Sequence, residues 1–331
     1  MKNILFIFTG GTISSKTSGN GLIATLKGEE IIKFVPEINK LCNIKCKQLF
    51  NLDSTNIGAK EWILIAQEIN NNYNNYDSFI IIHGTDTMAY TSSALSFMLL
   101  NIDKPVILTG SQLPIENSNT DAKDNIFNSV LAAISDIKGV YIVFNNKLIK
   151  GACATKFDTL DFNAFISPNR EISGYIEKNS LILKNKLDLK GKYIFNIDLN
   201  TKVYLLKITP NFDGNIINML VDMGYKGIII EGFGCGGIAE NIIENIKYAL
   251  KKDVIICVKS QCFKGKSSLD IYNVGVKIKK LGVLCLSDMT TEAAFIKLMW
   301  LLGKNISLKE IKNLMTKNFV DEIFIENNII N

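Results

Sequence analysis

Two short polar clusters in the sequence carry side chains that could do chemistry, and each follows an apolar run. The first is Thr85-Asp86-Thr87, which comes after the run 79–82 and the pair His83-Gly84. The second is Thr9-Gly10-Gly11-Thr12, which comes after the run 3–8. A threonine hydroxyl can act as a nucleophile when a neighbouring group accepts its proton. The clusters therefore indicate nucleophilic chemistry, although each could also be only a turn and a helix cap.

The base that would accept this proton is not fixed by the residue types alone. His83 is the only histidine in the chain, and a Ser/His/Asp or Cys/His apparatus would have to use it. Its position at the end of an apolar run favours a structural role in the core instead. Asp86 adjoins Thr85 and is one alternative. A lysine whose pKa is lowered by burial is another, and the sequence offers many lysines.

The elements around the clusters must bring them together. Both apolar runs are predicted to be strands buried on both faces, because they are short and mostly apolar. Helices and strands then alternate, which is typical of a doubly wound parallel sheet with right-handed crossovers. Such sheets bind ligands at the carboxyl ends of their strands, where both clusters lie. The predicted elements here are strands 3–8, 79–82, 105–109 and 139–144 and helices 29–34, 60–71, 88–100 and 121–135.

The fold class predicted for the whole chain is α/β, with two doubly wound, Rossmann-like parallel sheets. We expect a larger N-terminal domain over 1–185, a linker over 186–202 and a smaller C-terminal α/β domain over 203–331. The polar composition of the segment 13–27 predicts a mobile loop, which could be either a lid over the site or a plain connection.

Composition excludes several classes of function. The net charge of +5 over 331 residues comes with a single arginine, Arg170, and no basic stripe, so no nucleic-acid partner is expected. Seven cysteines without a Cys-x-x-Cys pair predict reduced thiols, and neither a metal site nor a cofactor is expected. The first predicted strand starts by residue 3, and no apolar run could span a bilayer. We therefore expect a cytoplasmic protein without a signal peptide or a membrane anchor.

At this point the sequence resembles a known family. Thr9-Gly10-Gly11-Thr12-Ile13 and His83-Gly84-Thr85-Asp86-Thr87-Met88 look like the two signature motifs of the bacterial-type L-asparaginases, in particular the cytosolic type I enzymes. The resemblance spans essentially the whole chain in order. It continues at Thr109-Gly110-Ser111-Gln112-Leu113-Pro114, 121–125, Ala154-Thr155-Lys156-Phe157, 260–262 and 288–293.

The resemblance implies hydrolysis of L-asparagine to L-aspartate and ammonia. It implies that Thr12 is the primary nucleophile and forms a β-acyl-threonine intermediate. Thr85, Asp86 and Lys156 are implied as a second set that activates the nucleophile or water. Asp86 is also implied to pair with the α-amino group of the substrate.

The resemblance also implies substrate-binding residues. The segment Asp53-Ser54-Thr55 is expected at the substrate, with Ser54 and Thr55 at its α-carboxylate. Gly11 and Gly84 would allow the backbone to approach closely, and backbone N–H groups near the two threonines would hold the oxyanion. Thr55 stands where periplasmic relatives carry glutamine and cytosolic ones a small hydroxyl residue.

One residue departs from the family pattern. Relatives usually carry a tyrosine in the mobile loop, and by spacing from Thr12 that position falls on Leu22. In cytosolic relatives, a tyrosine matching Tyr272 is thought to reach the site of a neighbouring subunit. We expect a homodimer or homotetramer in which Tyr272 serves this purpose. Some of these relatives also have a regulatory asparagine site near the residues matching Thr155 and Cys262, but we expect Cys262 to be a packed core thiol.

Two other functions fit the same residues. One is the amidase subunit of a tRNA-dependent amidotransferase, which normally carries an additional N-terminal domain. Thr9 lies so close to Met1 that we expect no such domain here. The other is an amino-acid-binding protein without catalysis, since a fold does not imply an activity. The joint presence of Thr12, Thr85, Asp86 and Lys156 favours an enzyme.

Overall fold

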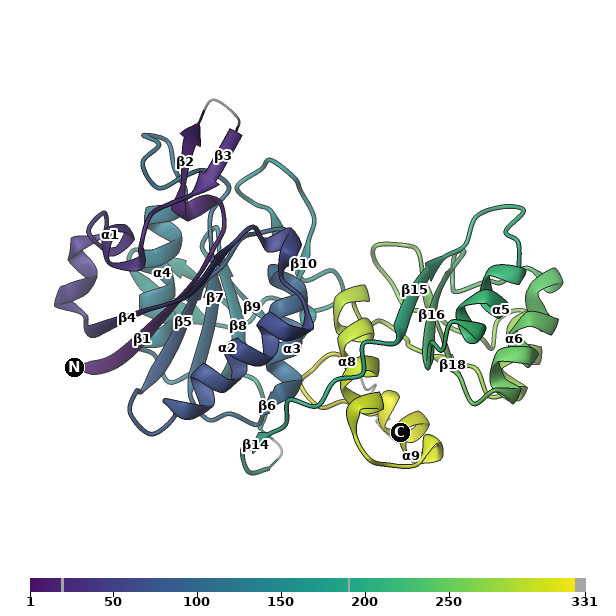
Figure 1. Cartoon of the computed structure of the whole chain (residues 1–331). Helices are drawn as coiled ribbons and strands as arrows, with labels where there is room; N and C mark the ends of the chain where they lie inside the picture. Colours follow the sequence, from purple (N-terminus) through teal and green to yellow (C-terminus); the bar gives the residue numbers. More distant parts are fainter. Residues whose placement is uncertain (19–20, 190, 325–331) are drawn as a thin grey trace. The chain divides into compact units, whose positions relative to one another are not determined.

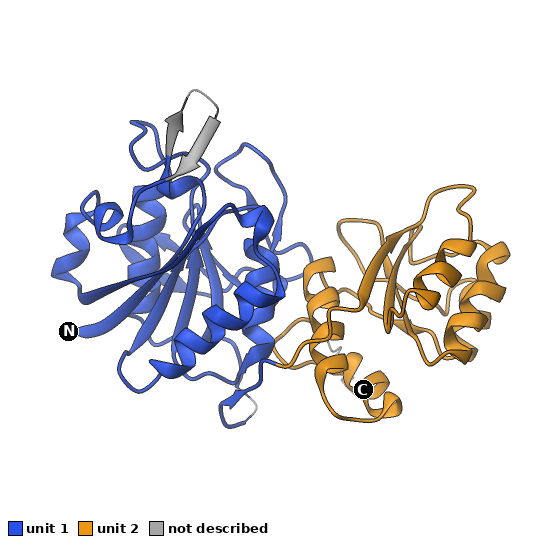
Figure 2. Ribbon diagram, in the orientation of Figure 1, with its two compact units in different colours: residues 1–197 blue, residues 198–331 orange. Residues whose placement is uncertain are grey.

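The chain divides into two compact units, Met1–Ile197 and Asp198–Asn331 (Figure 2). The computed structural model describes residues 1–18, 21–189 and 191–324, and the side chains of 16–24 fall outside this description.

Unit 1 is built on an eight-stranded sheet in the order β13-β12-β9-β8-β7-β5-β1-β4 (Figure 1). Strands β4, β1, β5, β7 and β8 run parallel to one another. The pairing Phe8↔Ile82 between β1 and β5 brings the carboxyl ends of both strands to the same edge, as the predicted topology requires. The sheet strands are β1 (Lys2–Gly10), β4 (Cys42–Leu52), β5 (Ser78–Ile82), β7 (Pro105–Thr109), β8 (Gly139–Phe144), β9 (Lys147–Lys150), β12 (Gly174–Glu177) and β13 (Ser180–Leu183).

The central strands are buried on both faces, as their apolar runs predict. Every residue of β5, β7 and β8 is buried. Helices α1 (Gly28–Ile32) and α4 (Ala122–Ala133) pack on one face, where Ile31 and Ile126 join the core. Helices α2 (Ala59–Asn71) and α3 (Met88–Met98) cover the other face (Figure 1).

The prediction of a wholly parallel sheet is wrong at one end of unit 1. Strands β8, β9, β12 and β13 pair antiparallel, which makes the sheet mixed. The turn between β8 and β9 is Asn145-Asn146, with φ values of 46° and 61°, and Lys178-Asn179 between β12 and β13 has 49° and 60°. Two consecutive residues at positive φ make the tight hairpin turn that matches strand twist, and asparagine tolerates this region best after glycine.

The segment expected as a mobile loop contains a short hairpin. After the 3-10 turn η1 (Thr12–Ser14), strands β2 (Ser15–Ser18) and β3 (Gly21–Ala24) pair antiparallel. Leu22, the position of the missing tyrosine, pairs with Thr17 through the backbone, and its side chain lies outside the described part. The smaller strands of unit 1 are β6 (Leu99–Leu100), β10 (Thr155–Lys156), β11 (Phe165–Ile166) and β14 (Ile194–Phe195).

Unit 2 has a separate core around a four-stranded parallel sheet, β15-β16-β17-β18. All of its predicted elements are present. An additional helix, α9, follows α8 and is one that the sequence pattern did not predict. The elements are β15 (Val203–Lys207), α5 (Asn215–Asp222), β16 (Gly227–Gly232), α6 (Ile243–Lys251), β17 (Ile255–Ser260), α7 (Asn273–Lys280), β18 (Leu284–Cys285), α8 (Thr291–Gly303) and α9 (Leu308–Met315).

Candidate active site

Three loops meet at Gly84, just beyond the carboxyl ends of β1, β4 and β5. A Cβ atom built on Gly11 would lie 2.4 Å from the Cα of Gly84, and one built on Gly84 would lie 2.7 Å from the Cβ of Ser54. Gly11 also has a φ of 85°, which side chains disfavour. Glycine is therefore required at both positions. The half-buried Thr12 and the buried Thr85 each follow one of these two touching glycines.

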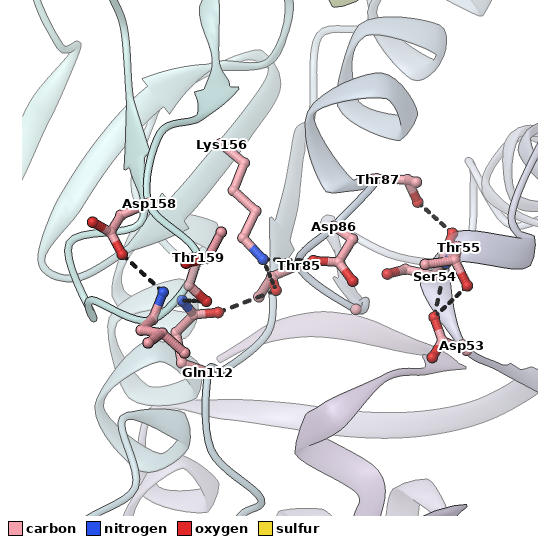
Figure 3. Close-up of polar contacts among 12 residues, drawn as sticks. Asp53, Ser54, Thr55, Thr85, Asp86, Thr87, Gln112, Lys156, Asp158 and Thr159 are labelled. Atoms are coloured by element: carbon pink, nitrogen blue, oxygen red, sulfur yellow. Dashed lines mark hydrogen bonds and ion pairs between the residues drawn. The ribbon is translucent and has the colours of Figure 1, made fainter. Parts of the chain in front are cut away.

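Thr85, Asp86 and Lys156 form one polar network at this edge (Figure 3). The ammonium of Lys156 donates to Thr85 Oγ1 over 2.9 Å and to Asp86 Oδ1 over 2.6 Å. The lysine side chain is 17% exposed and that of Asp86 56%, so the charge pair lies at the rim of the site while Thr85 lies deeper. Residues about seventy positions apart in the chain are thus in direct contact, as their assignment to one catalytic set requires.

Helix α3 fixes the segment that carries Lys156. The Oγ of Ser92 donates to the carbonyl of Gly151 over 2.8 Å, in the turn η4 (Gly151–Cys153) that precedes β10. A Cβ atom on Gly151 would lie 2.8 Å from the Oγ of Ser96, so only glycine lets the turn come this close. Because α3 begins directly after Thr85-Asp86-Thr87, the same helix positions both sides of the network.

The segment predicted to bind substrate forms its own turn, η3 (Ser54–Asn56). Asp53 caps this turn, since its Oδ1 accepts from the backbone N–H and the hydroxyl of Thr55, each over 2.8 Å. The hydroxyl of Thr87 donates to the carbonyl of Ser54 over 2.7 Å. Thr87 occupies the N-cap position of α3, but its side chain does not cap the helix and instead ties this turn to the Thr85 loop.

Gln112 is a residue at the site that the sequence prediction missed. Its Oε1 accepts the hydroxyl hydrogen of Thr85 over 3.2 Å. The signal was present, because Gln112 lies in a stretch that carries the family resemblance. Its residue type alone, however, suggests no catalytic role.

His83 has the structural role that its position predicts. It is fully buried, with Nδ1 2.7 Å from the carbonyl of Gly84 and Nε2 2.9 Å from the hydroxyl of Thr91. A carbonyl can only accept, so Nδ1 carries the hydrogen and Nε2 accepts from Thr91. Thr91 in turn accepts from Trp62 Nε1 over 3.0 Å. Burial lowers the pKa of His83 from 6.5 to about 4, so the ring is neutral at pH 7.

The buried His83 predicts that the protein loses stability in mild acid. Below pH 6.5 the unfolded chain binds a proton that the folded chain refuses until about pH 4, so stability falls as the pH falls through this window. The loss should reach about 3 kcal/mol near pH 4. Urea unfolding between pH 7.5 and 4.5 measures it, with His83→Asn as the comparison. Parallel losses in both proteins would exclude His83 as the source.

Two residues of unit 2 bear on the predictions. Tyr272 is 64% exposed and lines a pocket with Phe233 and Leu269, and its catalytic role stays a prediction. Cys262 is exposed, so the expectation of a packed core thiol is wrong. It lies in the loop after β17, beyond the buried part of the strand.

Within 1–18, 21–189 and 191–324, no group of three His, Cys, Asp or Glu side chains could hold a metal ion. No helix in these ranges is both long enough and apolar enough to cross a bilayer. All seven cysteines are free.

Comparisons with known proteins agree with this geometry. The family model "Asparaginase, N-terminal" matches residues 3–189, and "Glutaminase/Asparaginase C-terminal domain" matches 202–315. The L-asparaginase of Thermococcus kodakarensis is 34% identical over 97% of this chain and 98% of its own. Its solved structure superposes with a TM-score of 0.92 at 33% identity, over 97% of this chain and 99% of that one.

Two further relatives broaden the comparison. A glutamyl-tRNA(Gln) amidotransferase polypeptide of Pyrococcus abyssi is 36% identical over 98% of this chain and 77% of its own length. The probable cytoplasmic L-asparaginase of Campylobacter jejuni has a TM-score of 0.84 at 28% identity, over 96% of this chain and all of that one. Since two family models and full-length relatives above 30% identity agree, the chain belongs to the asparaginase family and is an amidohydrolase.

Proposed function

We propose that the chain is an L-asparaginase, which hydrolyses L-asparagine to L-aspartate and ammonia. The observation that carries this proposal is the contact of Lys156 with both Thr85 and Asp86, next to the touching glycines that precede Thr12 and Thr85. A protein that only binds an amino acid has no need of a lysine on a buried threonine hydroxyl.

In the proposed reaction, the hydroxyl oxygen of Thr12 attacks the side-chain amide carbon of asparagine. The C–N bond breaks, the proton lost by the hydroxyl ends on the departing ammonia, and a β-acyl ester on Thr12 remains. Water then adds to the ester carbon, aspartate leaves, and a proton of that water restores the hydroxyl of Thr12. Thr85, Asp86 and Lys156 move these protons, and backbone N–H groups near the threonines stabilise the oxyanion.

Three loops at Gly84 would supply the substrate contacts. The carboxylate of Asp86 would pair with the α-ammonium group of asparagine, and Ser54 with Thr55 would bind the α-carboxylate. The segment Asp53-Ser54-Thr55 suits this because Asp53 holds Thr55 in a fixed turn and Ser54 lies against Gly84. Gly11 and Gly84 would let the backbone approach the substrate.

A second candidate function is supply of ammonia to a tRNA-dependent amidotransferase. The 36% identity with the amidotransferase polypeptide of P. abyssi favours it. A chain with this function would release little ammonia from free asparagine unless its partner and an aminoacyl-tRNA were present.

Ammonia release by the purified chain separates the two functions. We expect release from L-asparagine, with kcat/KM about 10- to 100-fold lower for L-glutamine, because a site that mismatches by one methylene discriminates by about 1–3 kcal/mol. D-asparagine and D-glutamine serve as controls for stereochemical selection. Equal kcat/KM for the two L-amides would contradict the specificity, and no release from either would contradict the activity.

We also propose a cytoplasmic homodimer or homotetramer in which Tyr272 of one subunit completes the site of another. Seven free thiols suit a reducing compartment, and Tyr272 is exposed on unit 2. Sedimentation velocity measures the assembly state, and a monomer at working concentration would contradict the proposal.

A further inference from the structure

The hydroxyl of Thr85 has a single hydrogen, and the structure shows where it points. An ammonium group only donates, so the Thr85 oxygen accepts at Lys156, over 2.9 Å. The hydroxyl hydrogen is then donated to Gln112 Oε1, over 3.2 Å. Gln112 is therefore the group that accepts the hydrogen bond of Thr85 while Lys156 is charged.

The amide of Gln112 cannot turn around. Its Nε2 donates to the carbonyl oxygens of Thr159 and Asp161, each over 3.1 Å, which uses both amide hydrogens (Figure 3). A flipped amide would set its oxygen against these two carbonyls, which have no hydrogen to offer. The contact network thus assigns Oε1 to the Thr85 side.

The loop that receives the amide is itself braced. Asp158 Oδ1 accepts from the backbone N–H groups of Leu160 and Asp161, each over 2.8 Å. These bonds lower the pKa of Asp158, so the brace is a carboxylate at neutral pH. The loop leaves directly from Lys156, which means that one stretch of chain holds both partners of the Thr85 hydroxyl.

The backbone of Gln112 is fixed from the other side. The carboxylate of Asp121 accepts from the N–H groups of Gln112 and Leu113, over 3.0 to 3.2 Å. Asn125 donates to the same carboxylate and to the carbonyl of Gly110, each over 3.0 Å. Main chain and side chain of Gln112 are therefore held by separate elements, a degree of support that an incidental surface glutamine does not need.

We propose that Gln112 is a positioning residue that sets the direction of the Thr85 hydroxyl, and that the loop 157–163 in turn holds Gln112. The inference rests on the proposed function. In the resting site, Gln112 keeps the hydroxyl hydrogen away from Lys156 and leaves the Thr85 oxygen facing the ammonium. Once Lys156 loses a proton, the hydroxyl turns from Gln112 to the lysine, and the Thr85 oxygen becomes the acceptor for the proton of the nucleophile.

Gln112→Met tests the proposal, because methionine keeps the length of the side chain but removes its acceptor and its donors. We expect kcat on asparagine to fall about 10- to 100-fold, the loss that a misplaced reacting group causes, with KM changed less than about twofold. Gln48→Met is the matched control: the Gln48 amide also donates to two carbonyls, those of Phe8 and Phe50, which lie outside the network of Thr85. Asp158→Ala should give a smaller loss in kcat of the same kind.

A cycle with Thr85→Ser separates positioning of the hydroxyl from mere support of the loop. Serine lacks the methyl group that restricts χ1, so its hydroxyl depends more on an external partner. Gln112→Met should then cost more in the Thr85→Ser background than in the wild type. Losses that simply multiply, or a rise in KM with an unchanged kcat, would overturn the proposal.

A second readout does not need the activity. Urea unfolding of wild type, Gln112→Met, Thr85→Val and the double variant measures the coupling between the two side chains. We expect non-additive changes, and additive ones would overturn the inference even if the wild type releases ammonia. Conversely, a wild type without ammonia release contradicts the proposed function, while the unfolding cycle still decides whether Gln112 acts on Thr85.

Discussion

Thr12→Ala is expected to lower kcat on asparagine by about 10⁴-fold or more, because loss of a nucleophile leaves only the residual catalysis of binding and oxyanion stabilisation. Thr12 is half-buried in the turn η1, and its neighbours are held by the backbone rather than by its side chain. The fold should therefore survive the change. Initial rates of ammonia release measure the effect, and the thermal unfolding midpoint should move by no more than about 2 °C.

Thr25→Ala is the matched control for this prediction. Thr25 is exposed, lies in the same segment after β1 and contributes its backbone N–H to Ser14 whatever its side chain. It should keep near-normal rates. Substantial turnover by Thr12→Ala would reassign the nucleophile, and Thr85 would be the next candidate.

The same variant tests the proposed contribution of Tyr272 across an interface. Thr12→Ala subunits are mixed with Tyr272→Phe subunits, each nearly inactive alone. If Tyr272 acts on a neighbouring subunit, each hybrid dimer contains one site with both defects and one with neither, and has about half the wild-type activity. If Tyr272 acts within its own chain, no site is repaired and the mixture stays inactive. A fully active Tyr272→Phe enzyme would exclude the role altogether.

The parallel part of unit 1 could be predicted from sequence because its signals are local. The runs 3–8 and 79–82 are short and apolar, and each ends in glycine and threonine, so the buried strands and their shared edge follow from pattern alone. The antiparallel end of the sheet depends on Asn145-Asn146 and Lys178-Asn179 adopting positive φ. Asparagine takes that conformation only in some contexts, and no residue pattern there distinguished a hairpin from a loop.

The site could be predicted only partly, for a related reason. Family motifs assigned Thr85, Asp86 and Lys156, which the structure brings into contact. Gln112 is different, since its place beside Thr85 depends on the carbonyls of a loop nearly fifty residues further along. Hydrogen bonds to backbone carbonyls leave no trace in residue type.

The last prediction concerns Thr85 and Lys156 as a unit. Thr85→Val removes the hydroxyl with little change in volume, and Lys156→Met removes the ammonium while keeping most of the aliphatic chain. Each should lower kcat by about 10³-fold or more, and the double variant should be little worse than either one, because groups that act together lose activity non-additively. The geometry gives the reason: Lys156 reaches the reaction through the Thr85 oxygen, so without that oxygen its charge has no path to the nucleophile.

Lys150→Met provides the comparison for Lys156→Met. Lys150 lies at the end of β9, on the same segment of chain, and is not one of the partners of Thr85 described above. It should keep near-normal kcat. Losses that multiply in the Thr85→Val, Lys156→Met double variant would show two independent contributions. Lys156 would then act through Asp86 and the substrate ammonium, and KM for asparagine, rather than kcat alone, should rise in Lys156→Met because Asp86 loses the partner that holds it 2.6 Å away.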